Sequence, residues 1–82
     1  MLWISKLEGT DMFHANLRYA NLNSAHLNGA HLLNADLTYA KLTGANLAGA
    51  DLRNANLSNA DLYKADITGA MMHNANLFRA ML

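Results

Sequence analysis

The chain has 82 residues, enough for one small domain, and its six basic and six acidic side chains leave no formal net charge. A balanced charge argues against a nucleic-acid binder, which would carry a basic excess. Hydrophobic residues make up 52% of the chain and charged residues 15%, which argues against a disordered tail.

The chain contains no cysteine, so a disulfide framework, a thiolate metal site and a thiol nucleophile are excluded. No apolar run reaches the roughly eighteen residues of a membrane-spanning helix. The apolar start is too short for a signal sequence. We therefore expect a cytoplasmic protein that does not interact with membranes.

A five-residue repeat runs through the chain. Alanine occupies every fifth position from Ala15 to Ala80, a large apolar residue follows two positions later, from Leu2 to Leu82, and the residue between them is mostly Asn or Asp. A helix would spread these leucines over its whole surface, and a strand would send them to alternate faces. A path that turns a corner once per repeat keeps every leucine on the inside.

Three examples of the repeat are Ala15–Tyr19, Ala45–Gly49 and Ala50–Asn54. They resemble the pentapeptide repeat family, and the resemblance extends over nearly the whole chain, with mild departures at Met71 and Met81. It implies an all-β fold, the right-handed quadrilateral β-helix, with four repeats per coil. The 82 residues would then form a single solenoid domain of about four coils, in which 1–14 is a less regular first coil.

Residues twenty positions apart should stack if four repeats make one coil. Tyr19 and Tyr39 form one such pair, and glycine fills a whole column: Gly9, Gly29, Gly49 and Gly69. The glycines stand third in a corner, where a type II turn requires φ > 0. We predict type II turns at these corners and at the next ones along the chain, where Asn is frequent. Ser, Tyr, Lys and Arg are more common at the other two corners, which we expect to be less regular.

The titratable side chains do not predict a catalytic or metal site. Zinc needs three or four ligands that converge on one point, whereas the four histidines should point outward from a convex rod. The aspartates occupy the repeat's own Asn/Asp position, and general acid–base catalysis needs a cleft. We therefore expect no enzyme activity and no catalytic, cofactor-binding or metal-binding residues. The histidines are His14, His26, His31 and His73.

Large apolar side chains at outward or terminal positions form the candidate interaction surface. They are Trp3, Phe13, Leu33, Tyr19, Tyr39, Met81 and Leu82. Terminal coils leave backbone groups without partners, so we expect a homodimer through end coils, mainly through the C-terminal coil. Two alternatives stay open at the ends: Trp3 and Ile4 fold over the first coil as a cap, or the chain is a fragment of a longer repeat protein or a designed one.

The function expected from the sequence is a non-catalytic structural or protein-interaction solenoid that binds an unknown protein and no nucleic acid. The family resemblance supplies an alternative. Some pentapeptide repeat proteins are DNA-mimicking modulators of DNA gyrase and related topoisomerases. Those members are longer acidic rods, whereas this chain is short and neutral.

Overall fold

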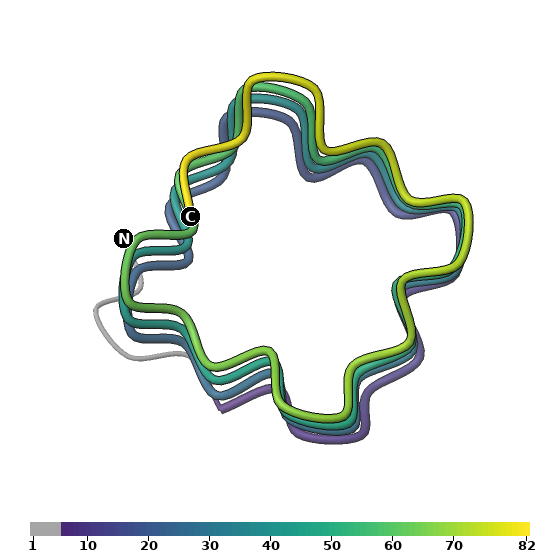
Figure 1. Cartoon of the computed structure of the whole chain (residues 1–82). Helices are drawn as coiled ribbons and strands as arrows, with labels where there is room; N and C mark the ends of the chain where they lie inside the picture. Colours follow the sequence, from purple (N-terminus) through teal and green to yellow (C-terminus); the bar gives the residue numbers. More distant parts are fainter. Residues whose placement is uncertain (1–5) are drawn as a thin grey trace.

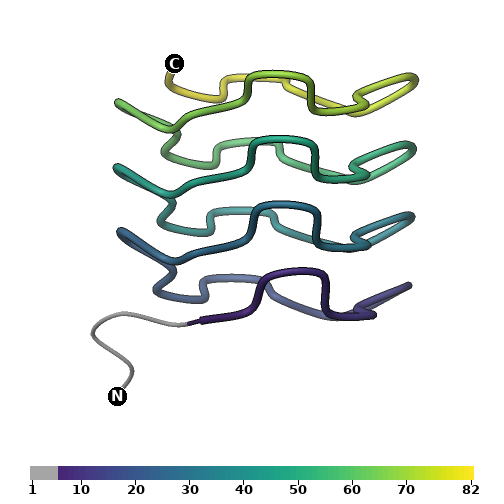
Figure 2. The same cartoon turned by 90° about the horizontal axis from the view of Figure 1, so that it is seen from below.

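The computed structural model describes residues 6–82. The chain winds as a right-handed coil with a four-sided outline, and the corners project outward (Figure 1). The coils stack along one axis, with residues 6 and 82 at opposite ends of the stack (Figure 2), and the rod measures 28 × 23 × 23 Å. The chain thus forms the quadrilateral β-helix expected from the repeat. Trp3 and Ile4, the alternative N-terminal cap, lie outside the described residues.

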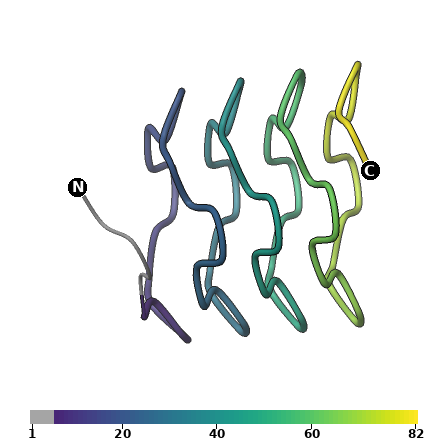
Figure 3. The ribbon, with the colours of Figure 1, turned by 90° about the vertical axis from the view of Figure 1, so that its left-hand side faces the viewer.

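The register between coils is twenty residues throughout the described chain. All twelve parallel bridges join residues twenty apart, for example Lys41 with Asp61. Each side contributes a single bridged residue between two turns, and residues 6–82 contain no helix and no longer strand. In side view the coils repeat one another closely (Figure 3). The predicted glycine column is also confirmed, since the Gly29 N–H donates to the Ala48 carbonyl of the next coil at 2.9 Å.

The four sides are numbered here in chain order, and each includes the corner that ends it. Side 1 begins with residues 6–10, side 2 with 11–15, side 3 with 16–20 and side 4 with 21–25. Each side continues with the residues that lie twenty, forty and sixty positions further along the chain, as the bridges require. Sides 3 and 4 are therefore neighbours along the whole rod.

The repeat Ala45–Gly49 shows why the fold uses this sequence, because each of its five N–H groups finds an acceptor. The Ala45 N–H closes the preceding corner, the Asn46 N–H donates to the coil before, and the N–H groups of Leu47 and Gly49 donate to the coil after. The Ala48 N–H is left over, and the Asn46 side-chain oxygen accepts it at 3.0 Å. Buried backbone groups must be paired, so an Asn or Asp at this position completes the hydrogen bonding of its repeat.

This use of the Asn/Asp side chain is general. In the described chain all ten Asn and Asp residues at the position after the small residue accept the N–H group two residues further on. Lys41 cannot do so, and there Asn23 of the coil before accepts the Thr43 N–H at 2.9 Å instead. The repeat therefore prefers Asn and Asp because these short side chains accept a hydrogen bond from a nearby backbone N–H, as they do in turns.

The core is a column of leucines with alanines between them. Leu27, Leu47 and Leu57 have no exposed surface, and the alanines of the central coils are buried as completely. Toward the C-terminal end the same positions open, and Ile67 and Leu77 are exposed by 38% and 36%. Burying one leucine contributes about 1.5–3 kcal/mol, so stacking on both faces of a coil is the main source of stability.

The prediction that two of the four corners are less regular is wrong. Tyr39 on side 3 and Ser24 on side 4 have φ values of 61°, and Gly49 on side 1 has 69°. Every described corner with a complete turn also closes with a hydrogen bond between its first and fourth residues, for example Ala40 N–H to Leu37 carbonyl at 2.9 Å. Residues other than glycine reach φ > 0 at modest cost, so type II geometry is uniform around the rod.

The expectation of a less regular first coil over residues 1–14 stays a prediction, because residues 1–5 lie outside the described part. Within residues 6–14, Leu7 and Met12 donate to the second coil at 2.8 Å, as their equivalents do elsewhere. The Thr10 side chain adds a bond to the Leu7 carbonyl at 2.7 Å.

Candidate interaction surface

The residues predicted for an interaction surface lie in three separate places. Phe13 and Leu33 stack on side 2, and Tyr19 and Tyr39 stack on side 3. Met81 and Leu82 lie at the C-terminal end of the rod, exposed by 55% and 73%. Trp3 lies outside the described residues. The structure therefore brings these residues together in pairs, and the pairs do not form one continuous patch.

The tyrosine pair on side 3 is an exposed, stacked aromatic feature. The rings of Tyr19 and Tyr39 are parallel within 9°, with centroids 5.1 Å apart, as the twenty-residue register predicted. Tyr19 is 64% exposed, and the Arg18 guanidinium lies 5.6 Å from the centre of its ring. Exposed tyrosine and arginine side chains are enriched at binding hot spots.

The apolar pair on side 2 is less prominent. Phe13 is exposed and meets the edge of the His31 ring, with centroids 5.6 Å apart, whereas Leu33 is half-buried. His31 lies in the ladder between Asp11 and Asp51. The ring of Phe13 therefore covers part of a polar column and leaves a small apolar surface.

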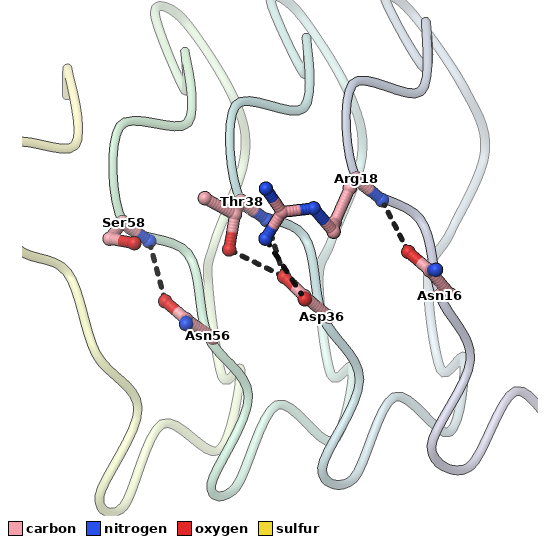
Figure 4. A network of polar contacts seen from close by, with 6 residues as sticks. All are labelled: Asn16, Arg18, Asp36, Thr38, Asn56 and Ser58. Carbon is pink, nitrogen blue, oxygen red and sulfur yellow. Dashed lines mark hydrogen bonds and ion pairs between the residues drawn. The ribbon is translucent and has the colours of Figure 1, made fainter.

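A polar network on side 3 holds Arg18 in place (Figure 4). Its guanidinium lies 3.5 Å from an Asp36 carboxylate oxygen, and both side chains are partly exposed. The Thr38 hydroxyl and N–H donate to the same carboxylate. These hydrogen bonds from Thr38, followed by the charge of Arg18, lower the pKa of Asp36 below its usual value of 3.8. Asp36 is therefore a structural acceptor that stays ionised.

Asp51 on side 2 is the one buried carboxylate of the described chain. Arg53 donates to it twice, from Nε at 2.8 Å and from an Nη at 2.7 Å, in the two-pronged geometry that suits guanidinium and carboxylate. The hydrogen bonds from Arg53 lower the pKa of Asp51 to about 2. The carboxylate thus binds its own coil and is not free to act on a substrate.

The histidines do not gather with other ligands. Among residues 6–82 no group of three or more His, Asp or Glu side chains could hold a metal ion. The same residues enclose no pocket, and they include no helix that could cross a membrane. The imidazole Nδ1 of His26 lies 3.6 Å from a Glu8 carboxylate oxygen.

Sequence reasoning missed three contacts between a cation and the aromatic ring next to it. Besides Arg18 with Tyr19, Lys64 lies 5.4 Å from the ring centre of Tyr63, and Arg79 lies 5.3 Å from that of Phe78. Each pair occupies the two central residues of a corner. The adjacency of aromatic and basic residues in the sequence was the available signal, and such pairs are attractive when the cation lies over the ring face.

The fold defines a class, the solenoid proteins whose repeats contact only their neighbours. The family profile for pentapeptide repeats, which represents eight copies of the repeat, matches residues 15–54 and 40–79. The chain therefore belongs to the pentapeptide repeat family. No match was found among the curated proteins.

Solved structures of the same family are similar to this chain. HetL from the cyanobacterium Nostoc sp. strain PCC 7120, a pentapeptide repeat protein involved in heterocyst differentiation regulation, is 43% identical over 94% of this chain with a TM-score of 0.90. A pentapeptide repeat protein from the cyanobacterium Cyanothece 51142 is 36% identical over 88%, with a TM-score of 0.86. One from the Arabidopsis thaliana thylakoid lumen is 35% identical over 93%, with a TM-score of 0.75. The matches span 36%, 50% and 57% of those three chains.

Proposed function

We propose that this chain is a non-catalytic protein-interaction module that binds a protein partner through its outer surface. The observation that carries the proposal is the division between inside and outside. Leucines fill the axis of the central coils, while five aromatic rings of the described chain are exposed at the corners. Function in such a rod must come from its surface.

The aspartates support the non-catalytic part of the proposal. Asp36, Asp51, Asp61 and Asp66 each accept the N–H group two residues further on, and Asp51 also binds Arg53. Their carboxylates thus accept backbone hydrogen bonds within their own repeats. The similarity to HetL, which is described as involved in regulation, supports a regulatory setting for the interaction. The equal number of acidic and basic side chains in the chain does not favour the DNA-mimicking alternative.

Photo-crosslinking in cells of the source organism tests the proposal. A benzophenone side chain is placed at Tyr39 on side 3, and in separate variants at Asn34 on side 2, Gly49 on side 1 and Thr43 on side 4. We expect one or a few specific proteins to be crosslinked from at least one position. The absence of any specific protein at all four positions would contradict the proposal. Asn occupies several corners with φ near 60°, so Tyr39→Asn removes the ring without straining the turn. This variant carries no crosslinker, and its matched backbone makes it the competitor of the labelled protein for the partner.

A further inference from the structure

The zero net charge of the chain hides a division between its two halves. Sides 3 and 4 carry four cations and two carboxylates, whereas sides 1 and 2 carry two cations and four carboxylates, so the halves differ in sign: a formal +2 against −2. The charged residues of sides 3 and 4 are Arg18, Asp36, Lys41, Asp61, Lys64 and Arg79. Sides 1 and 2 follow one another around each coil, as do sides 3 and 4, so the two sides of each half are adjacent (Figure 1).

The four cations of sides 3 and 4 are exposed, whereas the two carboxylates are half-buried and accept backbone hydrogen bonds. Asp36 accepts hydrogen bonds from Thr38, and the Asp61 carboxylate accepts the Tyr63 N–H at 3.1 Å. Both aspartates are only partly exposed, whereas Lys64 and Arg79 are exposed and make no ion pair within the described chain. Lys64 and Arg79 therefore give this half two exposed positive charges that no carboxylate of the described chain neutralises.

Most of the exposed aromatic rings lie on the same half. Four of the five exposed rings in the described chain belong to sides 3 and 4, and they are 47–64% exposed: Tyr19, Tyr39, Tyr63 and Phe78. Three of them have a basic side chain 5.3–5.6 Å from the ring centre. Aromatic residues and arginine are the residue types most enriched in protein interfaces. By contrast, the corner of side 1 presents only glycine at its third position.

We propose that the half formed by sides 3 and 4, here called the basic aromatic half, is the binding surface of the interaction module, and that its partner is an acidic protein segment. This inference rests on the proposed function and gives it a location and a partner chemistry. Charge complementarity selects acidic partners and repels basic ones. The exposed rings supply apolar contact beside the cations. The partner segment therefore carries Asp and Glu side chains interspersed with apolar ones.

The charge on this half argues for a protein partner over a nucleic acid. Proteins that bind duplex DNA neutralise several phosphates with Lys and Arg. Here four cations are spread over two sides of the rod, and Asp36 lies 3.5 Å from one of them, Arg18. A closely spaced line of phosphates would be repelled by the carboxylates of this half, such as that of Asp36. Separate Glu and Asp side chains of a peptide can instead pair with individual cations.

Titration followed by amide chemical shifts tests the proposal with three defined probes. They are a peptide of about ten residues that combines Glu, Asp, Ser and Leu, the same peptide with Lys in place of each acid, and a single-stranded oligodeoxynucleotide of similar length. We expect the acidic peptide to shift the amides of sides 3 and 4 only, with an effect that weakens as salt screens the charges. The Lys peptide and the oligonucleotide should cause no comparable shifts.

Variants with Asn at corners separate charge from fold. Lys64→Asn together with Arg79→Asn removes two cations at positions with φ of 59°, which Asn adopts elsewhere in the rod. Exposed charge pairs contribute little individually, so we expect the double variant to bind the acidic peptide about fivefold to tenfold more weakly. Lys6→Asn on side 1 is the matched control and should change the affinity less than about twofold.

Shifts on sides 1 and 2, equal binding of the Lys peptide or of the oligonucleotide, or no binding of the acidic peptide at about millimolar concentration would overturn the inference. The proposed function would then stand if photo-crosslinking still captures a specific protein, for example from Asn34 or Gly49. It would fall only if no position on any side crosslinks a specific protein. The two failures are therefore distinguishable.

Discussion

Leu47 in the centre of the rod and Leu77 in the last coil should differ strongly in what they contribute to stability. Leu47 has no exposed surface and is packed between two coils, whereas Leu77 is 36% exposed and packed on one face only. Truncation of a buried leucine to alanine typically costs 2–5 kcal/mol, because a cavity is left behind. We expect about 3–4 kcal/mol for Leu47→Ala, since the rigid coils above and below cannot collapse. For Leu77→Ala we expect about 1–2 kcal/mol, because less apolar area leaves water and no closed cavity forms.

Urea unfolding followed by far-ultraviolet circular dichroism measures both variants. The midpoints should move while the dependence on denaturant stays constant, which indicates a change in stability alone. Low protein concentration keeps any end-to-end association from burying Leu77. Equal costs for the two substitutions would refute the reasoning, because they would mean that the centre and the end of the rod are packed alike.

Four further predictions follow from the same structure. Met71→Asn should stabilise the chain by about 0.5–1 kcal/mol, since the new side chain can accept the His73 N–H, and a lower urea midpoint would contradict this. The pKa of Asp51 is held at about 2 against a usual 3.8, so its contribution to the free energy of unfolding is present above pH 3.8 and is lost as the pH falls toward 2. The urea midpoint of the Asp51→Asn variant should therefore depend less on pH over that interval, and an unchanged pH dependence would contradict this. Gly49 has φ of 69°, so Gly49→Val should cost more than 1 kcal/mol and Gly49→Asn about 0.5 kcal/mol or less in the same unfolding assay, and equal costs would speak against the turn geometry. Light scattering should show a concentration-dependent dimer of the 82-residue chain that Met81→Asn weakens, whereas a monomer at the highest concentration would remove the end-coil contact.

The sequence predicted the architecture because the repeat has a single geometric solution. A large apolar residue at every fifth position cannot be buried by a helix or by a flat sheet, and the spacing of Gly9 and Gly29 independently indicated twenty residues per coil. The stacking of Tyr19 on Tyr39 followed from the same register and is confirmed.

The regularity of the corners was not predicted correctly, because the preference of Gly and Asn for φ > 0 was taken to mean that corners with other residues adopt a different turn geometry. Tyr39 and Lys64 adopt nearly the same φ as the glycines, since the ladder bonds on both sides of the turn fix the backbone. The role of Asn46 and its equivalents was also missed. The sequence did contain a signal for this role, namely the recurrence of Asn and Asp at one position of the repeat, since these side chains often accept a backbone N–H two residues further on.

The candidate surface was predicted only in part. Exposure of the corner aromatics follows from the register, and Tyr19 and Tyr39 are exposed as expected. The division of charge between the two halves also depends only on position within the twenty-residue period, so counting charges by side would have found it. The contacts of the cations with the rings required side-chain conformations that no sequence pattern specifies.

Cysteine cross-linking tests the register of the coils most directly, because the chain has no cysteine of its own. Lys41 and Asp61 are bridged partners on neighbouring coils, and adjacent strand positions lie within disulfide range. Lys41→Cys with Asp61→Cys should therefore form an intramolecular disulfide rapidly under mild oxidation. Lys41→Cys with Asn56→Cys, fifteen residues apart and on different sides, should not. Efficient cross-linking of the second pair, or none of the first, would contradict a coil of twenty residues.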